Sequence, residues 1–132
     1  MRMSSASERK LVARRKALFR ALEEMRGKPV IVEGKRDKES LESCMIKRII
    51  PVNGRPREAC EMLAGENEAV ILTDFDKAGE EMLGQLSETL RGCGVRPNVD
   101  CRRMLRYALG LATFQEFDKR FGELMKQTEQ LR

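Results

Sequence analysis

Two stretches decide the fold of this chain: VIVEG at residues 30–34 and AVILTDFD at residues 69–76. Each begins with an uninterrupted apolar run rich in β-branched residues, and each run leads directly into acidic residues. Such runs are typical of strands that are buried on both faces of a parallel sheet. The carboxylates of Glu33, Asp74 and Asp76 therefore follow the carboxyl ends of two strands, where sites form in open α/β sheets.

The segments around these runs alternate between helical and strand patterns. Strand patterns cover residues 29–32, 45–52, 69–73 and 95–101. Helical patterns cover residues 7–26, 37–44, 56–64, 77–91, 102–110 and 114–127. Pro97 places the fourth strand at a sheet edge, because proline cannot donate to a ladder. This order predicts a compact Rossmann-like α/β domain with about four mainly parallel strands, helices on both faces, and helices at both termini.

The charge of the chain is concentrated at its N-terminus. The chain has 132 residues and a net charge of +5, and residues 1–26 hold eight Lys and Arg against three Glu. A chain of this length forms one ordinary domain. We therefore divide it into a basic N-terminal helix at residues 1–27, packed on the body, and a single domain at residues 28–132. Such a helix either follows a nucleic-acid backbone or presents a solvated face.

The composition disfavours several classes of protein. No apolar stretch approaches the roughly eighteen residues of a membrane helix. The N-terminal sequence MRMSSASERK lacks the apolar core of a signal peptide, so a cytoplasmic location without a membrane partner is expected. The four cysteines lack a C-x-x-C spacing and histidine is absent, which disfavours zinc and predicts reduced, mostly buried thiols. Acid–base chemistry near neutral pH then falls to carboxylates, lysine, a thiol or metal-bound water.

The pair Asp74 and Asp76 is the first candidate for a functional site. Residues two apart point to the same side of an extended segment. Two ionised carboxylates about 4 Å apart repel by roughly 4 kcal/mol at an effective dielectric constant near 20. Carboxylate oxygens suit Mg²⁺ or Mn²⁺, so we interpret Asp74, Asp76 and Glu33 as a metal-binding and catalytic set.

Each of these acids also has an ordinary structural interpretation. Asp76 is a suitable N-cap for the helix over residues 77–91, and Asp37 for the helix that it begins. Asp74 could cap a turn, and Glu33 could lie on the surface at the end of a strand. Arginines that pair with the acids and tie the sheet together are a further possibility.

Basic residues follow the acids closely. Gly34, Lys35 and Arg36 come directly after Glu33, and Lys77 comes directly after Asp76. A glycine lets a phosphate approach the backbone, and Lys and Arg side chains bind phosphate. Carboxylates, a divalent metal and cations together suit chemistry on a phosphodiester. Nucleic acid, either RNA or DNA, is therefore the expected partner, and Mg²⁺ or Mn²⁺ the expected cofactor.

The stretches VIVEGKRD and VILTDFDKAGEE resemble the motifs of the Toprim family, a Glu after the first strand and a D-x-D after the third. The resemblance covers about residues 28–101 and is closest to small stand-alone, primase-like members from archaea and bacteria. It implies that Glu33 acts as a general acid or base and that Asp74 and Asp76 bind metal. Asp37 and Gly79 match further motif positions. Topoisomerases tend to read D-x-D-R-E-G-E where this chain has DFDKAGE, which disfavours their chemistry.

Two functions remain open. The first is Mg²⁺-dependent phosphodiester chemistry on nucleic acid by a small nuclease, with RNA preferred by analogy with a ribosomal-RNA maturase of the same family. The second is a non-catalytic module that binds metal and nucleic acid, or a subunit of an RNA or DNA processing or repair complex. The single tyrosine, Tyr107, lies in an apolar helical pattern and is interpreted as a core residue. The oligomeric state stays open.

Overall fold

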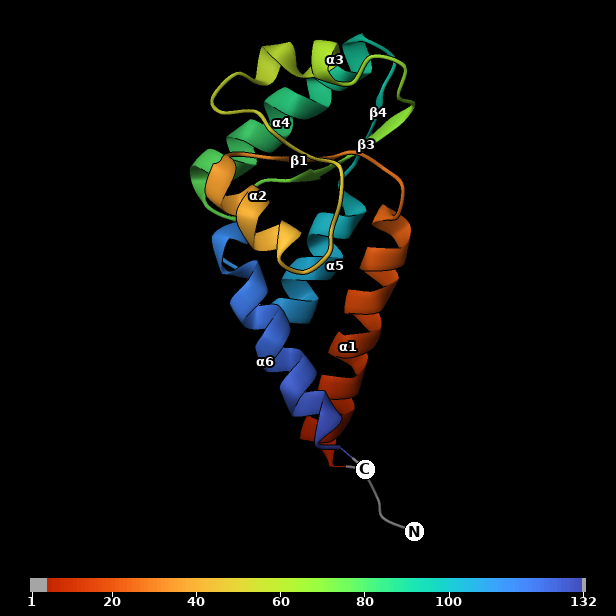
Figure 1. Cartoon of the computed structure of the whole chain (residues 1–132), viewed down its shortest axis with the longest axis vertical. Coiled ribbons are helices and arrows are strands. Elements are labelled where there is room, and N and C mark those ends of the chain that lie inside the picture. The colour runs from red at the N-terminus through yellow and green to blue at the C-terminus, as the bar shows by residue number, and fades with distance from the viewer. Residues whose placement is uncertain (1–4, 132) are drawn as a thin grey trace.

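The computed structural model describes residues 5–131 and shows within them a four-stranded parallel sheet between two layers of helices (Figure 1). The strands are β1 (Val30–Val32), β2 (Ile49–Pro51), β3 (Glu68–Leu72) and β4 (Arg96–Asn98), in the order β2-β1-β3-β4. The α-helices are α1 (Ala6–Met25), α2 (Lys35–Glu42), α3 (Ala59–Met62), α4 (Lys77–Gly92), α5 (Asp100–Leu109) and α6 (Phe117–Glu129). Two short 3-10 helices are η1 (Pro56–Glu58) and η2 (Phe114–Glu116). The predicted α/β class is confirmed. The predicted N-terminal helix at residues 1–27 and the domain at residues 28–132 include residues 1–4 and 132, which lie outside the described residues.

Successive residues of the central strands point into two separate cores. Val30, Val32, Val70 and Leu72 point into the core closed by α1, α2, α5 and α6, below the sheet in Figure 1. Ile31, Ala69 and Ile71 point into the core closed by α3 and α4, above the sheet. Every position of β1 and of residues 69–72 in β3 is therefore apolar, which explains the uninterrupted runs in the sequence.

The connections create a topological switch point between β1 and β3. After β1 the chain passes through α2, on one face of the sheet, to β2; after β3 it passes through α4, on the other face, to β4. The chain thus leaves two neighbouring strands in opposite directions, and the carboxyl ends of such strands are where open α/β sheets place their binding sites. These ends lie on the left in Figure 1, where α2 and α4 begin.

Both edge strands are three residues long, and each contains a proline, Pro51 in β2 and Pro97 in β4. The predicted edge position of the fourth strand is confirmed. The second strand is shorter than the apolar run over residues 45–52, because Met45 and Arg48 adopt positive φ angles of 68° and 59°. A left-handed backbone at these two residues is incompatible with an extended ladder.

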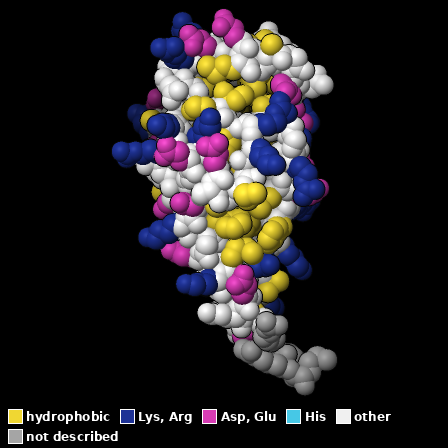
Figure 2. Space-filling view, viewed as in Figure 1, with side chains coloured by type: hydrophobic (Ala, Val, Ile, Leu, Met, Phe, Trp, Pro, Cys, Tyr) yellow, Lys and Arg dark blue, Asp and Glu magenta, His cyan; other side chains and the backbone are white. Residues whose placement is uncertain are grey.

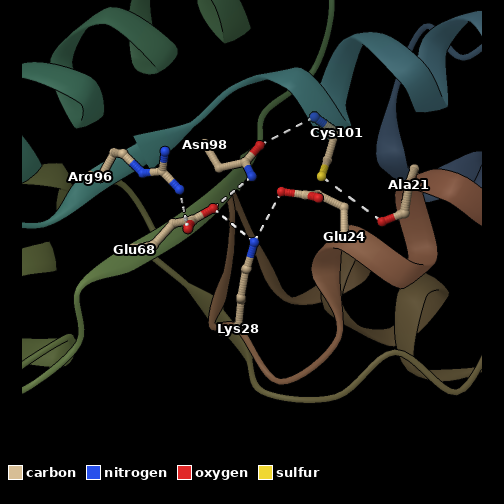
Figure 3. A network of polar contacts seen from close by, with 7 residues as sticks. All are labelled: Ala21, Glu24, Lys28, Glu68, Arg96, Asn98 and Cys101. Atoms are coloured by element: carbon tan, nitrogen blue, oxygen red, sulfur yellow. Dashed lines mark hydrogen bonds and ion pairs between the residues drawn. The ribbon is translucent and has the colours of Figure 1, made fainter.

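A polar network fastens the amino ends of the strands (Figure 3). Glu68, at the start of β3, accepts hydrogen bonds from Lys28 at 3.1 Å, Asn98 at 2.8 Å and Arg96 at 2.5 Å. Burial alone would raise the pKa of Glu68, but these three donors hold that pKa at about 2. Lys28 also pairs with Glu24 of α1 at 3.1 Å, so the network joins α1 to β3 and β4.

Helix α1 packs along α5 and α6. The Nε atom of Arg14 donates a hydrogen bond to the carbonyl oxygen of Ala108 at 2.9 Å. A guanidinium nitrogen of Arg15 donates to the Thr128 hydroxyl at 2.7 Å. At least two of the basic residues of α1 therefore serve helix packing.

Charged side chains of both signs cover much of the face shown in Figure 2, and hydrophobic side chains gather in two groups, one near the top in the region of α3 and α4 and one lower down beside α1. A cavity of about 520 Å³ lies between α1 and the segment after α2, on the side of the amino ends of β1 and β2. It is lined by Leu22, Met25, Arg26, Gly27, Cys44, Met45, Ile46, Lys47 and Arg48. None of the helices within residues 5–131 is long and apolar enough to cross a membrane.

Tyr107 lies on the outer surface of α5, with 57% of its surface exposed. The interpretation as a core residue is therefore wrong. The apolar pattern around it is real, but the helix buries Leu105, Ala108 and Leu109 and turns Tyr107 away from them. Helical geometry explains the error, because neighbours in sequence on a helix point in different directions.

Cys60 and Cys93 form a disulfide between α3 and the end of α4, with Cα atoms 6.2 Å apart. The expectation of reduced thiols is wrong for this pair, whereas Cys44 and Cys101 are free. Of the two free thiols only Cys101 is fully buried, and burial raises its pKa to about 12. The spacing of the pair in sequence carries no signal for the bond, because α3 and α4 are brought together by the tertiary fold.

Reduction of this disulfide is expected to lower thermal stability. A cross-link between residues separated by 33 positions restricts the unfolded chain and stabilises the fold by about 2–4 kcal/mol. Thermal melts with and without dithiothreitol should differ by roughly 10 °C. The double variant Cys60→Ser/Cys93→Ser should melt like the reduced protein and should not respond to dithiothreitol. A wild-type melt that is unchanged by the reductant would contradict the prediction.

Candidate functional site

Four carboxylates, here called the acid cluster, gather at the switch point: Glu33, Asp37, Asp74 and Asp76. Glu33 directly follows β1, and Asp74 is the second residue after the end of β3. Asp37 belongs to the first turn of α2, and Asp76 is the N-cap of α4. The charges of Glu33 and Asp76 act on Asp74, and the charge of Asp74 acts on Asp37. The structure thus brings together the acids that the sequence singled out.

Backbone N–H groups hold Glu33 and Asp74 in place. Glu33 Oε2 accepts a hydrogen bond from the Asp74 backbone N–H at 2.7 Å, which links the ends of β1 and β3. Asp74 Oδ1 accepts from the Phe114 N–H at 2.8 Å, which brings η2 to the site. Within residues 5–131, no N–H or hydroxyl donates to the second oxygen of either carboxylate. Each carboxylate is thus anchored by one backbone N–H, and the two carboxyl groups also contact each other, a hydrogen bond that helps to raise the pKa of Asp74.

Asp37 is the most buried member of the cluster, with 4% of its surface exposed. Its Oδ2 accepts from the Gly34 N–H at 3.0 Å, but its Oδ1 has no hydrogen-bond partner within the described residues. Asp37 is not the N-cap, because α2 begins at Lys35 with Gly34 as its N-cap, but it does cap the helix from the third helical position through this bond to the Gly34 N–H. A buried carboxylate oxygen without a partner is costly, so a proton, a water or a cation at Oδ1 would stabilise this side chain.

Asp76 is the N-cap of α4, as its structural interpretation predicts: its Oδ1 accepts a hydrogen bond from the Gly79 N–H at 2.7 Å. Gly79 lies against the backbone of Asp74. A Cβ atom at Gly79 would be 1.9 Å from the Asp74 carbonyl oxygen. The first turn of α4 can therefore approach the end of β3 this closely only with glycine at position 79.

The expected phosphate-binding residues are neighbours of the acid cluster in sequence and do not neutralise it. Lys35 is exposed and forms only a long contact of 3.9 Å with Glu39. Arg36 and Lys77 are also exposed, and Gly34 is half-buried. Among residues 5–131, no Lys or Arg forms an ion pair with a member of the acid cluster. The alternative in which arginines pair with the acids is therefore wrong for the described residues.

Burial raises the pKa of Asp74 to about 6; the charges of Glu33 and Asp76 and a hydrogen bond with the Glu33 carboxyl group add to this effect, and the Phe114 N–H opposes it. Burial also raises the pKa of Asp37, helped by the charge of Asp74 and opposed by its backbone hydrogen bond. Near neutral pH the acid cluster therefore carries unfavourable negative charge.

The metal-free protein is expected to lose stability as pH rises from 5 to 7. A carboxyl whose pKa is raised in the folded state binds its proton more tightly there, so folding weakens as pH rises past the unfolded value of about 4 towards 6. Asp74 alone should contribute on the order of 1 kcal/mol over this range. Melts in EDTA measure the slope. Asp74→Asn should flatten it, and the exposed control Glu88→Gln should leave it unchanged.

A cationic pocket adjoins the acid cluster. Its volume is about 370 Å³, and it is lined by Phe75, Glu80, Leu83, Val99, Arg102, Arg103 and Arg106. Phe75 is the residue between Asp74 and Asp76, so the pocket and the cluster share one segment. Sequence reasoning missed these arginines. Their spacing in α5 indicates a shared helix face, but nothing local shows that this face meets Phe75.

Within residues 5–131, no group of three or more Cys, Asp or Glu side chains is already arranged so that it could hold a metal ion. Each of the four carboxylates of the acid cluster is anchored through one oxygen by a backbone N–H, and Asp37 keeps one oxygen without a partner among the described residues. Such an arrangement suits a cation that takes one or two protein ligands and keeps several waters, as Mg²⁺ does.

The chain is 36% identical over 92 residues to the UPF0292 protein of Pyrococcus horikoshii, and the match covers 68% of this chain and 69% of that protein. The chain belongs to the UPF0292 family. Its similarity to the UPF0292 protein of Methanocaldococcus jannaschii is 33% identity over 81 residues, covering 57% of this chain and 62% of that protein. Family membership therefore rests on the greater part of the chain.

A solved structure of a protein from Aquifex aeolicus resembles this fold with a TM-score of 0.68. The two sequences are 26% identical, and the match covers 77% of this chain and 95% of that one. No family model matches this UPF0292 chain. The similarity thus supports the α/β architecture.

These comparisons correct the resemblance to the Toprim family. The relatives are UPF0292 proteins, and neither they nor the solved structure point to Toprim. The parallel topology explains the error, because acids after two neighbouring strands reach the same edge in unrelated α/β proteins. The roles that the resemblance implied for Glu33, Asp37 and Gly79 lose that support, and so does the preference for RNA. The geometry of the acid cluster does not depend on the resemblance.

Proposed function

We propose that this UPF0292 protein is a nuclease that cleaves nucleic-acid phosphodiesters with Mg²⁺ or Mn²⁺ bound at the acid cluster. The observation that carries the proposal is the Asp37 Oδ1 atom, which is buried and has no partner within residues 5–131. It belongs to a group of four carboxylates that no described Lys or Arg neutralises. A divalent cation supplies both the missing partner and the missing charge.

The donors at the acid cluster fit such a cation. Asp74 and Asp76 are the proposed metal ligands, and Asp37 offers its free oxygen directly or through a metal-bound water. Glu33 is the proposed general acid or base, because its Oε2 is anchored on the Asp74 N–H and its carboxyl group lies against that of Asp74, a proposed metal ligand. When bound, the metal would stabilise negative charge on the phosphoryl oxygens.

The basic residues next to the cluster are proposed to hold the substrate phosphate. Lys35, Arg36 and Lys77 are exposed at the starts of α2 and α4, the two helices that flank the switch point. Gly34 leaves the backbone before α2 uncovered by a side chain. These residues would orient the phosphodiester against the acid cluster.

A module that binds metal and nucleic acid without cutting is the second candidate, either alone or as a subunit of a processing complex. The observation that favours it is the lack, within the described residues, of three side chains already arranged around one metal position. A site that is completed only by a partner would look the same.

The test is end-labelled cleavage of structured RNA, single-stranded DNA and duplex DNA with Mg²⁺, with Mn²⁺ and with EDTA. Thermal melts at pH 7.5 with and without Mg²⁺ give a second readout that does not depend on activity. Metal-dependent cutting would support the nuclease. Stabilisation by Mg²⁺ without cutting would support the binding module. If the protein shows neither cutting nor stabilisation by Mg²⁺, the metal site is ruled out.

A further inference from the structure

We infer that Arg103 and Arg106 of α5, together with Phe75, form a subsite that binds backbone phosphates of a nucleic-acid strand passing the acid cluster. The inference rests on the proposed function only for the identity of the ligand as nucleic acid. A cluster of four carboxylates repels a polyanion, so a strand that reaches it needs cations nearby. The cationic pocket provides three arginines, and it lies on the side of the acid cluster that faces away from β1.

Arg106 is an available cation that is held in position. Its guanidinium carbon lies 4.9 Å from the centroid of the Phe75 ring. Arg106 is exposed, and within residues 5–131 its guanidinium forms no ion pair. Stacking on an aromatic ring restricts the side chain without removing its charge or its donors. Arg106 can therefore bind a phosphate with little loss of conformational entropy.

Arg102 has a different role in the same pocket. Its side chain is 5% exposed and pairs with Glu80 at 2.9 Å. It also donates to the carbonyl oxygens of Thr73 at 2.7 Å and Asp74 at 2.6 Å. These bonds tie α5 to the segment that carries the acid cluster. Arg102 is therefore a positioning residue, and it fixes the distance between the cluster and the exposed arginines of α5.

Arg103 is the second available cation. It pairs with Asp100, but both side chains are more than 70% exposed, at 73% and 72%. An ion pair this exposed contributes little and is readily exchanged for a phosphate. Tyr107 lies one turn further along the same outer face of α5 and offers an exposed ring on which a base can stack. The surface thus combines cations with an aromatic group, as nucleic-acid surfaces do.

The experiment is fluorescence anisotropy in EDTA with a labelled mixed-sequence 15-nucleotide single strand, made as RNA and as DNA. Arg106→Gln should weaken binding by about fivefold at 50 mM NaCl, and Arg103→Gln/Arg106→Gln by about twentyfold. The slope of log affinity against log salt should fall by about 0.7 for each phosphate that the variant no longer binds. The matched control is Arg91→Gln, an exposed arginine at the opposite end of α4 from the cluster, which should bind within twofold of wild type.

Equal affinities and salt slopes for Arg106→Gln and Arg91→Gln would overturn the inference, as would a wild type that binds neither probe. Binding in EDTA separates this result from the proposed function. Binding that depends on Arg106, without cleavage when metal is added, would keep the subsite and reject the nuclease. Metal-dependent cleavage with an unchanged KM in Arg106→Gln would keep the nuclease and reject the subsite.

Discussion

Asp74→Asn is expected to abolish metal-dependent cleavage, with kcat lower by about 10³-fold or more. The carboxylate of Asp74 is the member of the acid cluster on which the charges of Glu33 and Asp76 act, and its loss removes charge from the centre of the site. Metal stabilisation of a phosphoryl transition state contributes several kcal/mol, which corresponds to a rate change of this size. Asparagine keeps the Oδ1 atom that accepts from the Phe114 N–H, so the fold should be retained.

Two controls separate loss of chemistry from loss of structure. Without metal at pH 7.5, Asp74→Asn should be more stable than wild type by on the order of 1–2 kcal/mol, because it removes a buried, repelled charge. Mg²⁺ should then raise the melting temperature of wild type more than that of the variant. Glu88→Gln, an exposed change of the same charge on α4, should behave as wild type in both assays. Full cleavage by Asp74→Asn would remove Asp74 from the proposed metal site.

Gly79→Ala is expected to destabilise the protein by about 3 kcal/mol, at the upper end of the usual cost of overpacking. The added Cβ would be 1.9 Å from the carbonyl oxygen and 2.5 Å from the carbonyl carbon of Asp74. Both are backbone atoms, so no rotamer change relieves the overlap, and α4 must move away from the end of β3. That movement also breaks the bond of 2.8 Å from the Thr73 hydroxyl to the Gly79 carbonyl oxygen.

The matched control is Gly84→Ala in the same helix, where an added Cβ meets no atom within 4 Å. This exposed change should be neutral or stabilise the protein by up to about 1 kcal/mol, because alanine has the higher helix propensity. Urea denaturation of both variants measures the difference. Similar free energies of unfolding for the two variants would show that the contact with Asp74 does not constrain α4. Gly79→Ala should also impair metal binding, since α4 carries Asp76.

The pattern of apolar residues predicts the centre of this fold and fails at its margins. The stretches at 30–32 and 69–72 read as buried strands because both of their faces are covered, and that requirement leaves no polar position. The run at 45–52 looks equally apolar, yet Met45 is 79% exposed and only the last part of the run pairs with β1. The two positive φ angles that break the strand occur at non-glycine residues, which give no local signal.

The same limit applies to the candidate site. Glu33 and Asp74 could be placed together from the sequence, because parallel topology brings the ends of neighbouring strands to one edge. The unpartnered oxygen of Asp37 depends on how α2 packs against η2 and the rest of the fold, and the pairing of Arg106 with Phe75 depends on how α5 packs. Both are tertiary features without a sequence pattern of their own. The two acidic motifs in the sequence locate the carboxylates of the site correctly, but they do not identify the family to which the chain belongs.

The prolines in the edge strands have a consequence for how copies of this chain can associate. A strand from another molecule that pairs with β2 or β4 would meet only three residues, one of which, Pro51 or Pro97, has no N–H to offer. The native sheet is therefore a poor template for β-augmentation and for cross-β growth. Contacts between folded copies, or with an extended peptide, have to use the helical surfaces, and aggregation through strands would first require the sheet to open.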